Sequence, residues 1–319
     1  MSSNPPKPPS IARRALLLGG AGVIALGAGV TTAMHVALSP TQPSLEASSM
    51  AEYARFVRAQ NVDVLLIDKG QGLPIVFVHG IPNTSDLWRA SIERLSGSFR
   101  CIAFDLPGFG GSRATDGPFD LSLKNRAAFV SDMLDAAGIS EPCRLVAHDA
   151  GGTFAIPFTA EFPSRIDRAL FCITTMHPTF VWSRLGQRSR QPILGDLYAA
   201  FESKEDIAQR QRAIAPRLSQ EAIEGMLARY DGSMRRAVLD FYRNTDIGEY
   251  PRWQLAFERA CQGKRVEVIW GAHNPGNGEE TARRSFPGAA LTVYPDSGHW
   301  PMLEDEARWL DDLERFATA

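Results

Sequence analysis

Short apolar runs alternate with amphipathic stretches along most of the chain, from about residue 54 to the C-terminus. Uninterrupted runs such as IVFVHG are typical of strands buried on both faces of a parallel sheet. The runs predicted to form strands are Val62–Ile67, Pro74–His79, Arg100–Asp105, Arg144–His148, Ala169–Ile173, Val266–Trp270 and Leu291–Tyr294. The stretches with apolar residues at helical spacing are Asp86–Leu95, Lys124–Ala137, Thr153–Phe162 and Met302–Phe316. Consecutive β-α units of this kind predict an α/β fold, with a mostly parallel central sheet and helices on both faces.

One region interrupts this alternation. Between His177 and Gln262 the sequence has no strand pattern and becomes helical and charged. Two segments, Ser219–Tyr230 and Ser233–Arg243, each begin with serine, which is a preferred helix N-cap. The region is therefore predicted to be a helical insertion.

These patterns divide the chain into parts. Residues 49–177 and 263–319 are predicted to form the α/β body. Residues 178–262 are predicted to form a helical cap over the carboxyl ends of the strands, where open α/β sheets bind ligands. Residues 1–48 fall outside this globular part.

The N-terminal segment has the order of an export signal. Arg13 and Arg14 are followed by Ala15–Leu38, which is rich in Gly and Ala and contains no charged residue. Paired arginines before a weakly hydrophobic stretch resemble a twin-arginine signal. The alternative is a membrane anchor, because the stretch is long enough to span a bilayer. We expect an exported, periplasmic or otherwise extracytoplasmic protein, which contacts a membrane only through this segment if the segment is retained.

The composition and net charge of the chain argue against nucleic acid as a binding partner. The 319 residues are 44% hydrophobic, with a formal net charge of −2 and a pI near 6.3. Because the chain has no excess of basic residues, we do not expect nucleic acid as a partner. The four cysteines form no CxxC pair and are expected to be small buried hydrophobes, not zinc ligands or disulfides: Cys101, Cys143, Cys172 and Cys261.

The strongest chemical signal is the segment Leu145–Gly152 (LVAHDAGG). A predicted buried strand leads into a small-x-Asp-x-Gly turn and then a helix, which is the pattern of a nucleophile elbow. In such an elbow a sharp turn holds one side chain, here Asp149, above the end of the sheet. Ala147 stands where the first glycine is more usual. The alternative is that Asp149 is an ordinary helix N-cap.

Two further motifs lie at the ends of other predicted strands. In Val78–Pro82 (VHGIP) the backbone N–H of Ile81, together with that of Ala150, would form an oxyanion hole. In Asp296–Pro301 (DSGHWP) His299 follows the last strand, where a general base would stand. Taken singly, these could be a Gly-Pro turn and a solvated loop histidine. All three motifs fall at strand ends and in the right chain order, which favours a hydrolase.

These residues resemble the haloalkane dehalogenase and epoxide hydrolase branch of the α/β-hydrolase superfamily. The matching stretches are HGIPNTSDLWR (79–89), DLPGFGGS (105–112), AHDAGGT (147–153) and DSGHWPMLEDE (296–306). The resemblance implies that Asp149 attacks an sp3 carbon of a small, largely apolar substrate and forms an alkyl ester, which water activated by His299 then hydrolyses. It implies no metal or organic cofactor.

The acid partner of the histidine departs from the family pattern. In the segment WGAHN, Asn274 occupies the position of the aspartate that orients the histidine in the family. An amide cannot offset the charge of an imidazolium and can favour the wrong tautomer. Asp296, Glu279 and Glu280 are candidate substitutes. We therefore expect slow hydrolysis of the ester.

The leaving-group donors also depart from the dehalogenase pattern. Ile81 and Ala150 stand where dehalogenases carry side chains that bind the halide. Residues 236–244 resemble a lid helix of epoxide hydrolases, in which Tyr242 would donate to the epoxide oxygen, unless it only packs in the core. Tyr198 or Tyr230 could be a second donor. Epoxide opening is therefore favoured over halide displacement.

Two other functions remain open at this point. One is a weakly active or non-catalytic binding protein that keeps the fold and the pocket, which the missing acid and missing halide donors favour. The other is an ordinary esterase, which is disfavoured because neither Ser nor Cys occupies the elbow.

Overall fold

The computed structural model describes residues 29–275 and 278–319, and in this part of the chain a nine-stranded sheet forms the centre of the fold. The strand order is β1-β2-β4-β3-β6-β7-β8-β9, and β5 pairs with β2. Every pairing from β4 to β9 is parallel, whereas β1, β2 and β5 pair antiparallel. The predicted α/β class is thus confirmed. The strands are β1 (Ala54–Ala59), β2 (Val62–Lys69), β3 (Pro74–Val78), β4 (Arg100–Phe104), β5 (Arg113–Ala114), β6 (Cys143–His148), β7 (Ile166–Cys172), β8 (Arg265–Gly271) and β9 (Ala290–Tyr294).

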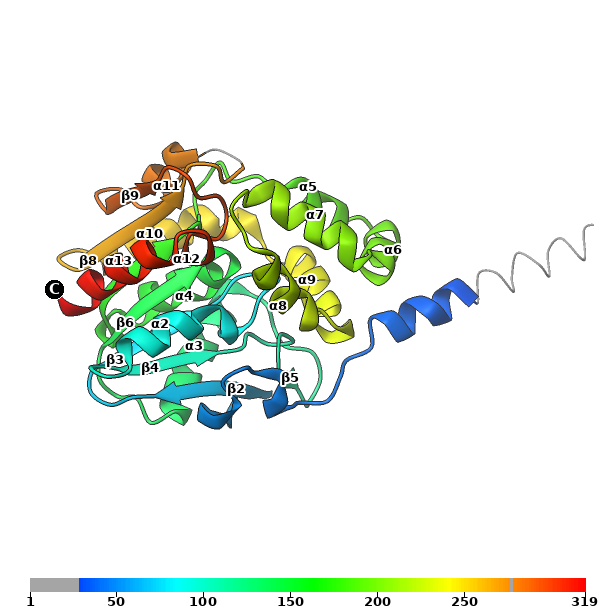
Figure 1. The fold of residues 1–319 in the computed structure, drawn as a ribbon, viewed down its shortest axis with the longest axis horizontal. Helices are drawn as coiled ribbons and strands as arrows, with labels where there is room; N and C mark the ends of the chain where they lie inside the picture. Colours follow the sequence, from blue (N-terminus) through cyan, green and yellow to red (C-terminus); the bar gives the residue numbers. More distant parts are fainter. Residues whose placement is uncertain (1–28, 276–277) are drawn as a thin grey trace, which may run out of the picture.

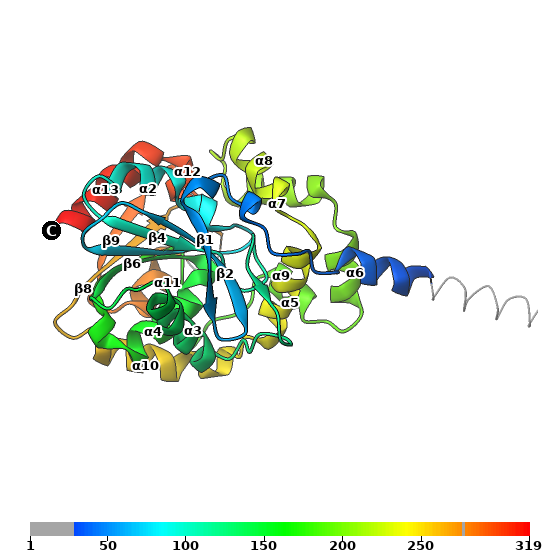
Figure 2. The same cartoon turned by 90° about the horizontal axis from the view of Figure 1, so that it is seen from below.

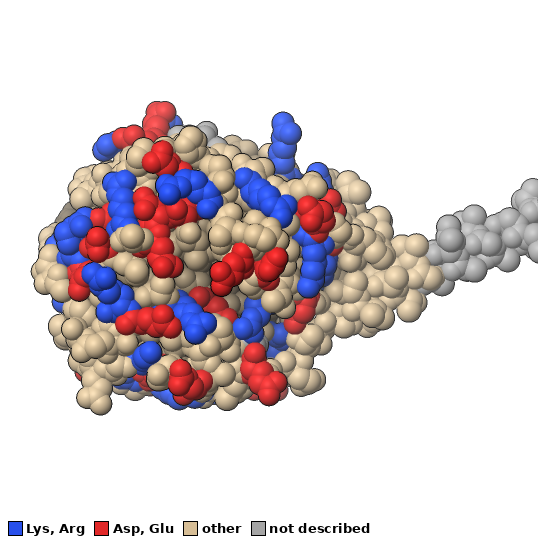
Figure 3. Space-filling view, viewed as in Figure 1, with Lys and Arg blue, Asp and Glu red and all other residues tan. Residues whose placement is uncertain are grey.

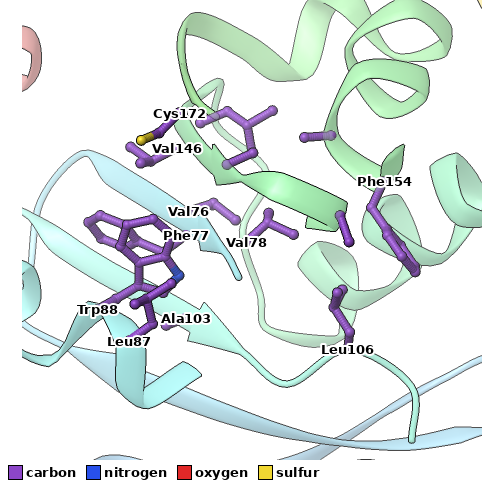
Figure 4. Close-up of a cluster of buried hydrophobic side chains, with 14 of the residues drawn as sticks. Val76, Phe77, Val78, Leu87, Trp88, Ala103, Leu106, Val146, Phe154 and Cys172 are labelled. Carbon is purple, nitrogen blue, oxygen red and sulfur yellow. The ribbon is translucent and has the colours of Figure 1, made fainter. Parts of the chain in front are cut away.

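The two central strands are buried along their whole length. Every residue of β3 and of β6 is buried, because both faces of the sheet are covered by helices. Figure 4 shows side chains of both strands packed with those of neighbouring elements, among them Trp88, whose ring centroid lies 5.4 Å from that of Phe77. Burial of each large apolar side chain stabilises the fold by roughly 1.5–3 kcal/mol. The two strands that lead into the Val78–Pro82 and Leu145–Gly152 motifs are therefore part of the buried core.

Helices cover the sheet on two sides (Figure 2). In that view α2, α12 and α13 lie above the sheet, and α3, α4 and α10 lie below it. The predicted helix 302–316 is interrupted at Asp305, which separates α12 from α13. The body helices are α2 (Arg89–Leu95), α3 (Leu123–Ala136), α4 (Gly152–Glu161), α10 (Tyr250–Ala260), α11 (Gly278–Ser285), α12 (Pro301–Glu304) and α13 (Glu306–Thr318); short 3-10 turns are η1 (Leu45–Ala47), η2 (Ala51–Tyr53), η3 (Ser85–Trp88), η4 (Asp149–Gly151), η5 (Pro163–Arg165) and η6 (Ile247–Glu249).

The inserted region forms a helical cap at one end of the sheet (Figure 1). Its helices are α5 (Arg184–Ser189), α6 (Leu194–Phe201), α7 (Lys204–Ile214), α8 (Gln220–Ala228) and α9 (Gly232–Asn244). Ser219 caps α8 as predicted, but Asp231 and not Ser233 caps α9, because its carboxylate accepts the Met234 N–H at 2.9 Å. The Ser233 hydroxyl instead accepts the Thr41 N–H at 2.7 Å. Helix α10, at the end of the inserted region, packs on α4 beneath the sheet.

The N-terminal segment meets the molecule at the cap. Residues 29–37 are helical and project from the body beside α6 (Figures 1 and 2). Leu38 then packs with Ala200 and Leu239 of the cap. Most of the predicted export segment, residues 1–28, lies outside the described residues. Within the described ranges, no helix is both long and apolar enough to cross a bilayer.

Candidate active site

The nucleophile elbow is built at the carboxyl end of β6. Asp149 has a φ of 48°, a left-handed conformation that costs energy for a residue with a side chain. The Thr174 hydroxyl holds this turn by donating to the Asp149 carbonyl at 2.7 Å. The Asp149 carboxylate does not cap α4. Its Oδ1 accepts the backbone N–H of Ile81 at 3.1 Å, which places the carboxylate at the predicted oxyanion position.

Small residues allow the strand ends to approach the elbow. A Cβ on Gly80 would lie 2.6 Å from the Asp149 Cβ and 2.8 Å from its Oδ1. A Cβ on Gly151 would lie 2.5 Å from the His79 carbonyl oxygen. Both positions therefore exclude any side chain. Ala147, where the sequence departs from the usual glycine, is fully buried within β6.

His299 faces the carboxylate from the loop after β9. Its Nε2 lies 3.7 Å from the Asp149 Oδ2, and the two side chains are 14% and 26% exposed, so neither is sealed from solvent. Its Nδ1 donates to the Asn274 Oδ1 at 2.8 Å. Because the proton is on Nδ1, the Nε2 lone pair points toward Asp149, as a general base requires. Asn274 thus supplies the useful tautomer but no charge.

The predicted substitutes for the missing acid lie elsewhere, so that expectation is wrong. Glu279 and Glu280 are on α11 and pair with Arg283 and Arg284, and Asp296 is exposed. Burial lowers the pKa of His299 below its ordinary value, while the charges of Asp149 and Glu304 act in the opposite direction. Sequence reasoning missed Glu304, although it stands in the matched stretch 296–306.

Two other histidines near the site are buried and hydrogen-bonded to backbone groups, so neither is a candidate general base. His148 donates from Nε2 to the His299 carbonyl at 2.9 Å, and burial holds its pKa well below the ordinary value. His79 donates from Nδ1 to the Gly80 carbonyl and accepts the Leu106 N–H at Nε2, each at 2.9 Å, and burial lowers its pKa to about 4. Both imidazoles are therefore neutral at ordinary pH and serve to position loops.

The cap holds the loop that carries His299. The backbone N–H of His299 donates to the carbonyl of Ile214, the last residue of α7, at 2.9 Å. The indole N–H of Trp300 donates to the Gln211 side chain on the same helix at 2.9 Å. Movement of α7 would therefore move the candidate base.

An aromatic cluster of the cap and its border contains two tyrosines that the charge of Asp149 influences. The ring of Trp182 lies 5.1 Å from Phe180 and 5.2 Å from Tyr242, and Phe180 lies 5.2 Å from Tyr250. Burial raises the pKa of both tyrosines, and the charge of Asp149 raises each further. Tyr242, predicted from the sequence, therefore lies within electrostatic reach of Asp149. Tyr250, which no motif marked, does so too.

The other two candidate tyrosines have different neighbours. The Tyr198 hydroxyl donates to Glu202 and accepts from Arg210, so it belongs to a charged cluster inside the cap. Tyr230 is buried near the same pair, and burial raises its pKa to about 12, with Glu202 adding to the shift. Their contacts are those of structural residues of the cap.

A buried arginine joins the cap to the elbow helix. Arg126 on α3 donates to the hydroxyls of Thr153 on α4 and Thr245 after α9, at 2.5 and 2.6 Å. Its guanidinium lies 5.0 Å from the ring of Phe154 and 4.9 Å from that of Phe241. Burial lowers its pKa to about 10. Because a helix pattern alone cannot reveal such contacts, sequence reasoning did not find this residue.

With this geometry in place, comparison with known proteins defines the class. The family model described as the alpha/beta hydrolase fold matches residues 74–306, so the chain belongs to the α/β-hydrolase fold family. Within that family, part of the chain is similar in sequence to haloalkane dehalogenases, and its fold is similar to that of an epoxide hydrolase.

Individual relatives match parts of the chain. A haloalkane dehalogenase of Agrobacterium fabrum is 31% identical over 156 residues, which are 46% of this chain and 50% of that protein. A cis-3-alkyl-4-alkyloxetan-2-one decarboxylase of Shewanella oneidensis is 37% identical over 109 residues, 34% of each chain. The chain therefore spans about a third to a half of the length of these two relatives.

Solved structures share the fold at low identity. An epoxide hydrolase of Bacillus megaterium superposes with a TM-score of 0.65 at 18% identity, over 83% of this chain and all of that one. An esterase of Thermogutta terrifontis gives a TM-score of 0.67 at 22% identity, over 83% of this chain and 97% of that one. These similarities establish the fold.

Proposed function

We propose that the protein hydrolyses a small, largely apolar epoxide or a related electrophile through an alkyl ester on Asp149. One observation carries the proposal: a carboxylate, not a hydroxyl or thiol, stands on the elbow, with a backbone N–H at one oxygen and an imidazole 3.7 Å from the other. A carboxylate is a nucleophile suited to an sp3 carbon that bears a strained oxygen or a halide.

In the first step an oxygen of Asp149 attacks the carbon and the carbon–oxygen bond of the epoxide breaks. The alkoxide that forms takes a proton from the hydroxyl of Tyr242. Before reaction, burial and the charge of Asp149 both raise the pKa of this tyrosine and keep it protonated. Esterification removes the charge of Asp149, so the hydroxyl becomes a better acid as the alkoxide develops.

In the second step water attacks the carbonyl carbon of the ester, and the Nε2 of His299 takes its proton. The N–H of Ile81, which already contacts Asp149, donates to the oxyanion, assisted by the N–H of Ala150. Collapse of this intermediate breaks the ester bond and returns the carboxylate. The proton on His299 passes to the leaving alkoxide, so the product is a diol. The second proton of the water, left on the Asp149 carboxyl, passes to the phenolate of Tyr242, which restores both groups.

The donors available favour ring opening over halide displacement. The alkoxide formed by ring opening needs a proton, which the hydroxyl of Tyr242 can donate. A halide leaves without a proton and needs only hydrogen bonds. The indole N–H of Trp182, which packs on Tyr242, is buried and has no hydrogen-bond partner among the described residues. In the proposed reaction this indole N–H helps to hold the leaving group. Trp182 was not found from the sequence, which has no motif around it.

The test is turnover of a substrate panel by the full-length protein. The panel contains terminal epoxides, chloro- and bromoalkanes, and an oxetan-2-one, the ring named for the Shewanella relative. We expect diol formation from an epoxide and background rates with Asp149→Asn. Equal turnover by that variant would remove Asp149 from the mechanism.

A non-catalytic binding protein is the second candidate, and the neutral Asn274 beside His299 is the observation that favours it. The two functions differ in their response to Asn274→Asp. An enzyme with a weakened second step gains turnover, whereas a binding protein stays inactive on every member of the panel.

We also propose that the chain is exported and works at a membrane surface. Support comes from Arg13, Arg14 and the uncharged stretch that follows. Further support comes from exposed apolar side chains, of which Val36 lies on the projecting helix and Ile193, Leu194 and Phe201 lie at or near α6. Figure 3 shows charges of both signs mixed over the body, and none on the tan part of the projecting segment.

Fusing residues 1–48 to a reporter that folds in the cytoplasm tests this. We expect export that Arg13→Lys with Arg14→Lys abolishes. A reporter that stays in the cytoplasm with either sequence would contradict the proposal.

A further inference from the structure

Glu304 is a buried carboxylate next to the backbone of the candidate base. It ends α12 and is 6% exposed. Its Oε2 accepts the N–H groups of Gly298 and Trp300, the two neighbours of His299, at 2.9 and 3.0 Å. Its Oε1 accepts the backbone N–H of Arg217, from the cap, at 3.2 Å. All three donors are uncharged.

The charge of Glu304 has no cationic partner in the part of the chain that the structure describes. Among the ion pairs of residues 29–275 and 278–319, none includes Glu304. Burying a carboxylate without a cation is unfavourable unless hydrogen bonds compensate it, and here three backbone N–H groups do so while leaving the net negative charge in place. Its field reaches the site, because it raises the pKa of the Cys172 thiol and acts to raise that of His299.

In the second step of the proposed reaction, a negative charge near His299 would stabilise the imidazolium that forms. When His299 takes a proton from water it becomes a cation. Asn274, its hydrogen-bond partner, is neutral. Asp149, the other carboxylate that acts on His299 in the resting protein, is by then a neutral ester. Glu304 is left as the carboxylate that still opposes the positive charge.

We propose that Glu304 is the positioning residue that stabilises protonated His299 during ester hydrolysis and so compensates in part for the missing acid at position 274. The role in turnover rests on the proposed function. The electrostatic coupling between Glu304 and His299 does not, so it can be measured separately.

Several other groups surround the imidazole of His299 and can influence its pKa. Asp149 faces Nε2 and Asn274 faces Nδ1. His148 lies with its ring centroid 5.2 Å away and is neutral at ordinary pH. The cap contributes the uncharged carbonyl of Ile214. Glu304 and Asp149 are therefore the two charges to separate by mutation.

The first experiment is an NMR titration of the histidine side chains in the full-length protein and in Glu304→Gln, an isosteric change that removes the charge and keeps an acceptor oxygen. We expect the midpoint of His299 to fall by about one pH unit, a typical effect of one neighbouring charge. Glu306→Gln, at an exposed carboxylate two residues on, should leave the midpoint unchanged. An unchanged midpoint in Glu304→Gln would overturn the coupling.

The second experiment separates a charge effect from a structural one. In single-turnover kinetics with an epoxide, Glu304→Gln should slow ester hydrolysis roughly tenfold, the equivalent of one pKa unit, and leave ester formation unchanged. The same substitution in an Asn274→Asp background should cost much less, because the new carboxylate at position 274 then compensates the charge of the imidazolium. An equal loss in both backgrounds would show that Glu304 only holds the loop. Absence of any ester in the unmodified protein would instead contradict the proposed function.

Discussion

The Nδ1 of His299 donates to the amide oxygen of Asn274 at 2.8 Å, in the place where a carboxylate would hold a catalytic histidine. This contact fixes the orientation and the tautomer of the imidazole. It cannot balance the charge that the imidazole acquires when it removes a proton from water.

Asn274→Asp should therefore accelerate ester hydrolysis, by roughly 10²-fold or more on the scale of the reverse change in a serine-protease triad. Ester formation should change little, because His299 takes no part in it. Single-turnover measurements of both steps check this, with His273→Asn as a control at the neighbouring position. No acceleration of the second step would mean that charge at position 274 is not what limits it.

The pH dependence follows from the state of His299. Only the neutral imidazole accepts a proton, and burial lowers its pKa below the ordinary 6.5. Ester hydrolysis should therefore stay constant as pH falls to about that value, and decline only at lower pH. Asn274→Asp adds a nearby negative charge, so its acid limb should move to higher pH. A decline that begins above pH 7 in the unmodified protein would contradict the assignment of His299.

Tyr242→Phe should distinguish the two leaving groups. It removes the hydroxyl but keeps the ring against Trp182. Ester formation from epoxides should slow by about 10²-fold, the contribution of one general acid, while halide displacement should change little because a halide needs no proton. Tyr250→Phe is the matched control at a second buried hydroxyl near Asp149. Similar effects of both substitutions on both substrate classes would refute the specific role of Tyr242.

Arg126 provides a prediction about stability. Arg126→Ala leaves a cavity between two aromatic rings and should lower the free energy of unfolding by roughly 2–5 kcal/mol. Arg126→Met fills most of that space and removes a buried charge, so it should cost less than about 1.5 kcal/mol. Urea denaturation compares the two variants. If Met is as destabilising as Ala, the hydrogen bonds to Thr153 and Thr245 matter more than packing.

The sequence predicted those parts of the molecule that depend on local pattern. The central strands appeared within a few residues of their bounds, because runs buried on both faces leave an uninterrupted apolar signal. Strand β1 was missed, since its sequence ARFVRA is edge-like and partly exposed. Strand β5 has only two residues, too few for any pattern.

Some residues of the candidate site were predicted from the sequence, and others were found only in the structure. Asp149, His299 and Ile81 follow strand ends, so the order of strands places them together. Glu304 acts on the site through backbone N–H groups, which carry no mark in a sequence. Tyr250 begins a helix outside every motif and reaches the site only through tertiary packing. Such residues become visible only when the chain is folded.

The most direct test of the covalent mechanism is a single turnover in water enriched in ¹⁸O, with excess protein over an epoxide. Because water attacks the ester carbonyl, the label should enter the carboxylate of Asp149 and not the first diol released, and peptide mass spectrometry should find it there. Label that appears only in the diol, with an unlabelled Asp149, would show that water attacks the substrate directly and would contradict the account.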